Sequence, residues 1–341
     1  MAELILDNIS KTFNDQTAVN KLSLTIPEGA FCALLGPSGC GKTTTLRMIA
    51  GLENLTSGSL TMNGQVLDNG NCFIPPEKRK MSMVFQSYAL WPHMTVRENV
   101  AYPLKVQRQP ATQIQATMRR VLKTVDMEKY ADRKIQELSG GQRQRVALAR
   151  CLVAEPEVVL LDEPLANLDR HLRSAMEQSF REFHRKTGAT FVFVTHDQAE
   201  AMALATHVAV LNQGELIQWG TPESLYQQPK SSWLARFIGK GSVLNLPIKQ
   251  HHNNRKLNAG DFELNSSVTP IPILLRPEHV RIADAGITAY VKDCVFLGER
   301  YLLTLSFIHD QQSVICYHDS ALLLNTTVNV MLEQGWRVDV A

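Results

Sequence analysis

A glycine-rich segment near the start of the chain has the residue types and spacing of a phosphate-binding loop. The pattern G-x-x-x-x-G-K-[ST] is matched in full by Gly36-Pro37-Ser38-Gly39-Cys40-Gly41-Lys42-Thr43, and Thr44 follows. Such glycines let backbone N–H groups wrap around phosphate oxygens, and a helix that begins here adds partial positive charge. Lys42 can reach the outer phosphates, and the Thr43 hydroxyl can ligate Mg²⁺. We therefore predict that this loop binds the phosphates of a nucleotide with Mg²⁺ and that Cys40 is a small filler rather than a redox switch.

A second segment places two carboxylates at the end of an apolar run. Asp162 and Glu163 directly follow Val158-Val159-Leu160-Leu161. A continuous apolar run of this kind is typical of a strand buried on both faces. Such a strand would deliver the Asp162 carboxylate to the magnesium ion. Because side chains alternate along a strand, we expect Glu163 to point elsewhere and to act as the general base for an attacking water.

A third segment offers a second anion site. It reads Leu138-Ser139-Gly140-Gly141-Gln142 and precedes a helical run over 143–153, with Ser139 placed as the N-cap. Helix N-termini with free backbone N–H groups bind anions. The first two segments alone would also fit kinases and GTPases. The third resembles the signature sequence of ABC ATPases, and this resemblance spans nearly the whole chain.

The resemblance implies roles for two further polar residues. Gln86, in Val84-Phe85-Gln86-Ser87-Tyr88, looks like the glutamine that contacts the metal and the water and senses the permease. His196, after Phe191-Val192-Phe193-Val194-Thr195, looks like the switch histidine that contacts the γ-phosphate. A surface amide and a structural histidine are the alternative interpretations.

Three more positions match the pattern of the family. The segment Leu165-Ala166-Asn167-Leu168-Asp169 resembles the D-loop, in which Asn167 and Asp169 would bridge to the partner subunit. Phe13 lies where the family has an aromatic ring that stacks on adenine, and a Phe offers the π-face that stacking needs. A plain core position is the alternative for Phe13.

The elements that must position these residues indicate an α/β fold. Phe31 to Leu35 is a buried strand, residues 43–50 form a helix that Gly51 can cap, and Phe191 to Val194 adds another buried strand. Antiparallel strands precede residue 31, and Asn63-Gly64 is a hairpin turn. From about Thr95 to Lys134 the pattern turns helical and charged, which indicates an inserted helical subdomain over about 88–156. We predict a P-loop core with an antiparallel β subdomain and an inserted helical subdomain.

After Phe237 the sequence changes to short β-like runs separated by polar turns, as in a small β-barrel. We predict an ATPase domain over 1–238 and an all-β, OB-like domain over 239–341, with 239–242 as a linker. Arg276-Pro277-Glu278-His279 resembles a motif of the regulatory domain found on importer ATPases, although Glu278 and His279 could equally serve packing. This resemblance, together with residues 195–202 and Gly220-Thr221-Pro222, implies an importer ATPase for ferric iron, another anion or a polyamine. The ATPases of sugar importers resemble this sequence less well.

Composition excludes several classes of protein. The 341 residues carry a formal net charge of +2, which argues against nucleic-acid binding. The amino terminus lacks the features of a signal peptide, and no stretch approaches the roughly 18 apolar residues of a membrane span. Six scattered cysteines indicate reduced thiols in a cytosolic protein. His251-His252 has no further ligand at metal-binding spacing, so we expect no metal there.

These observations lead to one hypothesis. The chain is expected to be the ATPase subunit of an ABC importer, active as a homodimer on the cytoplasmic face of the membrane and bound there to permease subunits. A solute-binding protein would be an indirect partner. By resemblance, each site combines Lys42, Thr43, Gln86, Asp162, Glu163 and His196 of one chain with Ser139, Gly140 and Gly141 of the other. Gln142 is also expected to bind the nucleotide. Two alternatives are a soluble ABC protein of translation or DNA repair and a binding module in which ATP is structural.

Overall fold

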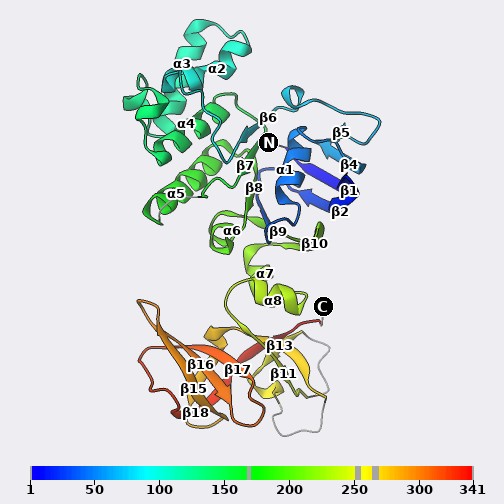
Figure 1. Cartoon of the computed structure of the whole chain (residues 1–341), viewed down its shortest axis with the longest axis vertical. Helices are drawn as coiled ribbons and strands as arrows, with labels where there is room; N and C mark the ends of the chain where they lie inside the picture. The colour runs from blue at the N-terminus through cyan, green and yellow to red at the C-terminus, as the bar shows by residue number, and fades with distance from the viewer. Residues whose placement is uncertain (1, 167–169, 250–254, 263–268, 340–341) are drawn as a thin grey trace. The chain divides into compact units, whose positions relative to one another are not determined.

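The computed structural model describes residues 2–166, 170–249, 255–262 and 269–339. The chain divides into two compact units, Met1–Pro222 and Glu223–Ala341 (Figure 1). Among the described helices, none combines the length and the apolar character that crossing a membrane requires. Each unit is described by itself below.

A mostly parallel sheet forms the centre of the first unit, in the order β10-β9-β3-β8-β7-β6. β3 pairs in parallel with β8 and β9, β7 pairs in parallel with β6 and β8, and β10 runs antiparallel to β9. Every residue of β3, β7 and β8 is buried, as their continuous apolar runs require. The strands are β3 (Phe31–Leu35), β6 (Met81–Val84), β7 (Val158–Asp162), β8 (Thr190–Thr195), β9 (His207–Asn212) and β10 (Glu215–Gly220).

An antiparallel sheet of the same unit has the order β2-β1-β4-β5. Its strands are β1 (Leu4–Phe13), β2 (Gln16–Ile26), β4 (Ser57–Met62) and β5 (Gln65–Asp68). The alternation over 22–26 places Leu22, Leu24 and Ile26 in the core. Asn63 and Gly64 both have positive φ, 49° and 77°, which is the geometry of the predicted hairpin turn between β4 and β5.

Helices follow strands of the parallel sheet, as in other α/β folds. α1 (Lys42–Ala50) begins after β3 and ends at Gly51, whose φ of 79° gives the left-handed cap expected of glycine. α5 (Arg170–Thr187) follows β7, and α6 (Gln198–Leu204) follows β8 with Asp197 as its N-cap. The carboxyl ends of the strands therefore lead into the segments that carry the predicted chemistry.

Arg79 fixes the carboxyl end of α1, whose amino end carries the phosphate loop. It follows η1 (Pro76–Lys78), and its side chain is fully buried. The guanidinium donates to the carbonyls of Met48 at 2.7 Å, Ile49 at 2.9 Å and Ile74 at 2.7 Å. A cation at this end also complements the helix dipole.

We expect Arg79→Met to lower the free energy of unfolding by about 3 kcal/mol, because it orphans buried carbonyls that a charged donor now satisfies. Chemical denaturation of the purified chain is the measurement. Arg185→Met removes an exposed arginine from α5 and should change stability by less than about 0.5 kcal/mol. Equal stability of both variants would contradict this role for Arg79.

Helices fill the region between β6 and β7. They are α2 (Val96–Val106), α3 (Ala111–Thr124), η2 (Glu128–Tyr130), η3 (Ile135–Glu137) and α4 (Gly140–Leu152), and Figure 1 shows α2, α3 and α4 gathered together. The amino ends of α2 and α4 each have a capping box, made by Thr95 with Glu98 and by Ser139 with Gln142. This is the region in which an inserted helical subdomain was predicted.

The second unit is mainly β-structure, in two sheets ordered β11-β13-β19-β12 and β14-β18-β15-β16-β17. Short helices precede and interrupt them, namely α7 (Pro222–Gln227), α8 (Ser232–Phe237), η4 (Ala259–Asp261) and η5 (Pro277–His279). The first sheet contains β11 (Ser242–Leu246), β12 (Lys256–Asn258), β13 (Ile271–Leu275) and β19 (Gln334–Arg337). The second contains β14 (Val280–Ala283), β15 (Ile287–Phe296), β16 (Tyr301–Phe307), β17 (Ser313–His318) and β18 (Thr327–Leu332).

Arg276 binds backbone on both sides of residue 239 within the second unit. Its buried guanidinium donates to the carbonyls of Ile238 and Lys240, at 2.8 and 2.9 Å, and to that of Tyr226. The segment predicted as a linker, 239–242, is thereby bound to this unit. The Tyr226 hydroxyl donates to a carboxylate oxygen of Glu278 at 3.0 Å, so Glu278 makes a contact within this unit.

Candidate active site

The predicted phosphate loop curls around the ammonium group of Lys42. The lysine Nζ donates to the carbonyl oxygens of Gly36 and Pro37, both at 2.8 Å, and the side chain is buried. Gly41 has a φ of 97°, and a Cβ there would lie 2.4 Å from the carbonyl oxygen of Ala18 in β2. Only glycine therefore fits at this position, where the loop passes close to β2 before α1 begins.

Thr43 and Asp162 form a hydrogen-bonded pair of oxygen groups at the end of β7. The Thr43 hydroxyl donates to the Asp162 Oδ1 at 3.2 Å. Burial raises the pKa of the Asp162 carboxyl, while the hydrogen bond from Thr43 acts in the opposite direction. A nearby cation would favour the ionised carboxylate, and two protein oxygens suit Mg²⁺, which takes its other ligands from phosphates and water. Among the described residues, no cluster of three His, Cys, Asp or Glu side chains could hold a metal ion by itself.

Gln86, Glu163 and His196 meet beside this pair. The Gln86 amide donates to Glu163 Oε2 at 3.1 Å, and His196 Nδ1 lies 3.5 Å from Glu163 Oε1. The three residues follow β6, β7 and β8, whose parallel pairing brings their carboxyl ends to one edge of the sheet. Glu163 is partly buried, whereas His196 and Gln86 are exposed. The site thus places a carboxylate next to an imidazole and an amide.

The orientation of Glu163 has a different origin from the one expected. β7 ends at Asp162, and Glu163 adopts a left-handed conformation with φ of 47°, while its N–H donates to the Val194 carbonyl at 3.2 Å. Alternation along a strand therefore does not set its direction; a turn held by β8 does. Left-handed backbone is uncommon for a residue other than glycine and is held here by its surroundings.

Residues 139–142 form a turn at the amino end of α4, where we predicted a second anion site. The Ser139 hydroxyl accepts from the Gln142 N–H at 3.3 Å, and the Gln142 side chain accepts from the Ser139 N–H at 2.9 Å. Ser139 is exposed, and a Cβ on Gly140 would meet no atom within 4 Å. Within the described part of the chain, no hydrogen bond or ion pair joins residues 139–142 to Lys42, Asp162 or Glu163.

Phe13 lies at the end of β1 and is 41% exposed. The Lys11 ammonium sits 4.8 Å from its ring centroid. Phe13 pairs with Gln16, the first residue of β2, and β2 passes the phosphate loop at Ala18. The exposed ring is therefore not a core residue and has a face on which a base could stack.

Cys40 is buried, and burial raises the pKa of its thiol. Asn167, Asp169 and the pair His251-His252 lie outside the described residues.

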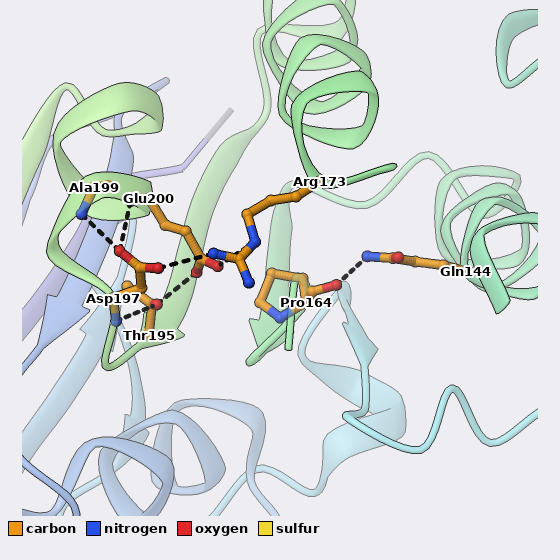
Figure 2. Close-up of polar contacts among 7 residues, drawn as sticks. All are labelled: Gln144, Pro164, Arg173, Thr195, Asp197, Ala199 and Glu200. Atoms are coloured by element: carbon orange, nitrogen blue, oxygen red, sulfur yellow. Dashed lines mark hydrogen bonds and ion pairs between the residues drawn. The ribbon is translucent and has the colours of Figure 1, made fainter. Parts of the chain in front are cut away.

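Three side chains make tertiary contacts around the site that no sequence motif predicted. Arg150 of α4 donates to the carbonyls of Tyr88 and Ala89, at 2.9 and 2.7 Å, just after Gln86. Gln144 of α4 donates to the carbonyl of Pro164, next to Glu163 (Figure 2). Arg173 of α5 binds Asp197, next to His196. Arginine and glutamine on a helix are ordinary surface residues, so only the fold reveals these contacts.

Lys42→Ala should weaken ATP affinity about 10- to 100-fold, because charge-assisted hydrogen bonds of about 1.5–3 kcal/mol to the phosphates are lost. Equilibrium binding of a labelled nucleotide measures the change. Lys80→Ala, which removes an exposed lysine paired with Glu157, should bind as tightly as the wild type. An unchanged dissociation constant for Lys42→Ala would mean that the loop does not bind phosphate as described.

Family models match both parts of the chain. A model described as ABC transporter matches residues 19–166, and a model described as TOBE domain matches residues 273–333. Among solved structures, the ATP-binding cassette MJ0796, a dimer bound to ADP and Pi, is 31% identical with a TM-score of 0.57 and covers 64% of this chain and 98% of its own. The cbiO1 protein from Clostridium perfringens, part of an ABC transporter complex, is 27% identical with a TM-score of 0.61 and covers 65% and 90%.

Curated relatives match over nearly the full length. The spermidine/putrescine import ATP-binding protein PotA of Nitratidesulfovibrio vulgaris is 39% identical over 98% of this chain and 96% of its own. The sn-glycerol-3-phosphate import ATP-binding protein UgpC of Paracoccus denitrificans is 41% identical over 85% and 81%, and the Fe(3+) ions import ATP-binding protein FbpC of Vibrio cholerae is 40% identical over 92% and 90%. These comparisons confirm the predicted α/β ATPase fold with a C-terminal all-β domain. The chain therefore belongs to the ATP-binding subunits of ABC transporters, as an importer ATPase with a C-terminal TOBE domain.

Proposed function

We propose that two copies of this chain bind two ATP molecules between them and hydrolyse them to drive solute import through a membrane permease. The observation that carries the proposal is the meeting of Gln86, Glu163 and His196 beside the Thr43–Asp162 pair. These groups come from four separate segments of the chain and converge where the phosphate loop ends. A module that used ATP only structurally would have no need of a carboxylate and an imidazole there.

Each of these residues has its own role in ATP hydrolysis. Glu163 accepts a proton from the attacking water, and His196 contacts the γ-phosphate. Thr43 and Asp162 would hold Mg²⁺, which would neutralise charge that develops on the phosphates. Gln86 contacts the same region from the loop after β6. Hydrolysis then requires no covalent intermediate with the protein, since positioning and charge stabilisation suffice for phosphoryl transfer.

The shared site follows from two separate anion-binding helix ends. Lys42 and Ser139 stand at the amino ends of α1 and α4, and the exposed Ser139 is free to meet the nucleotide of a second copy. A γ-phosphate between two such ends would hold the dimer closed, and its loss would release the halves. The dimeric MJ0796 cassette bound to ADP and Pi supports this arrangement.

The proposed location is the cytoplasmic face of the membrane, where the dimer would bind permease subunits and a solute-binding protein would act indirectly. Relatives of nearly equal identity carry names for import of spermidine/putrescine, glycerol-3-phosphate and ferric iron. This spread supports a general division of labour, in which the ATPase supplies energy and its membrane partners select the solute. Spermidine and putrescine are the first solutes to test.

The test is ATP hydrolysis by the purified chain in the presence of Mg²⁺, followed by uptake of labelled spermidine or putrescine into vesicles that contain the chain and its co-purified permease. We expect phosphate release that stops when EDTA removes the metal, and uptake that requires ATP. ATP binding without any hydrolysis would instead favour the structural role for ATP.

A further inference from the structure

Arg173 lies in the first turn of α5 and is bound to the loop that carries His196. Its Nη1 donates to Asp197 Oδ2 at 3.0 Å, and its Nε lies 3.8 Å from Glu200 Oε1 (Figure 2). Both carboxylates belong to the turn that starts α6, directly after His196. One guanidinium therefore spans the two carboxylates that define this turn.

The same turn is closed from within by hydrogen bonds. The Asp197 N–H donates to Thr195 Oγ1 at 3.0 Å, and the Thr195 hydroxyl donates to Glu200 Oε2 at 2.6 Å. Asp197 Oδ1 caps α6 by accepting from Ala199 N–H at 2.8 Å. His196 is thus held between two residues, Thr195 and Asp197, whose side chains are both fixed.

The positive charge of Arg173 compensates the buried carboxylate of Glu200. Glu200 is 5% exposed, and a carboxylate so deeply buried is costly unless a cation and hydrogen bonds compensate it. Arg173 supplies the cation, and its planar fork reaches Asp197 at the same time. Without it, two carboxylates would face each other across the turn, and their repulsion would displace the backbone that carries His196.

We propose that Arg173 is a positioning residue for the ATPase reaction, which acts through Asp197 and Glu200 to hold the His196 imidazole toward the γ-phosphate. The inference rests on the role of His196 in the proposed function. The orientation of His196 then depends on the position of α5, which contains Arg173. A shift at the start of α5 is then transmitted to the imidazole through the Arg173 side chain.

The experiment measures kcat and KM for ATP in the full-length chain, by single-turnover kinetics where rates are slow. We expect Arg173→Met to lower kcat about 10- to 100-fold, the usual cost of a small misplacement of a reacting group, with KM changed less than about threefold. Arg173→Lys keeps the charge but loses the fork, so it should recover only part of kcat. Arg185→Met, on the exposed side of the same helix, is the matched control and should behave as the wild type.

The decisive comparison uses His196→Ala as a background. If Arg173 acts through His196, Arg173→Met should lower kcat no further once the imidazole is gone, because coupled residues are not additive. A full additional loss in that background, or a wild-type kcat for Arg173→Met alone, would overturn the inference while leaving the role of His196 intact. A wild-type kcat for His196→Ala itself would instead overturn the proposed function of the site. Thermal unfolding of each variant separates a loss of fold, which would also overturn the inference, from a loss of positioning.

Discussion

Glu163→Gln should still bind ATP but hydrolyse it about 10²–10⁴-fold more slowly than the wild type, which is the usual contribution of a general base. The amide has nearly the shape of the carboxylate but cannot accept the proton of the attacking water. It can still contact Gln86 and His196, which now lie 3.1 and 3.5 Å from the carboxylate oxygens. The fold and the phosphate loop should therefore be unaffected, and the defect should lie in the chemical step.

The measurement combines phosphate release with analysis of oligomeric state in the presence of ATP. The variant should accumulate as an ATP-bound dimer, since the γ-phosphate that holds the two copies together is no longer removed. Glu155→Gln, an exposed carboxylate that precedes β7, is the control and should turn over ATP normally. Near-normal hydrolysis by Glu163→Gln would exclude Glu163 as the base.

Mixing a Ser139→Arg chain with a Lys42→Ala chain should restore ATPase activity that neither homodimer has. If each site combines Lys42 of one copy with Ser139 of the other, a mixed dimer has one site with both lesions and one site with neither. Purified mixed dimers should then show up to about half of wild-type activity if the sites act independently, and less if they are coupled. Ser139→Arg places a large side chain at an exposed position and removes the N-cap of α4, which costs about 1 kcal/mol, so α4 should be weakened only slightly.

The control for the mixing experiment is a dimer of each mutant chain with a wild-type chain. These dimers also keep one intact site, and they show how strongly one damaged site reduces the activity of the other. Activity in the wild-type/mutant dimers together with none in the mixed mutant dimers would mean that both lesions fall in one site. The arrangement in trans would then be wrong.

Several strands and helix ends could be predicted from short stretches of sequence, because the residues in those stretches determine them. The buried runs at 31–35 and 158–161 became central strands, since only strands covered on both faces bury every side chain. Gly51 ends α1, and Ser139 caps α4, as their residue types predict. The two compact units divide at Pro222, whereas the domain boundary at residue 238 stays a prediction, and Arg276 binds carbonyls on both sides of it.

The sequence by itself determined which chemical groups this protein offers, because the glycine-rich loop over 36–43, the paired carboxylates and the Ser-Gly-Gly turn before α4 are contiguous motifs with fixed spacing. The tertiary structure alone decided how their members meet. The parallel pairing of β6, β7 and β8 brings Gln86, Glu163 and His196 together from positions far apart in the chain. The turn of Glu163 and the reach of Arg173 to Asp197 depend on neighbouring elements, so no local pattern encodes them.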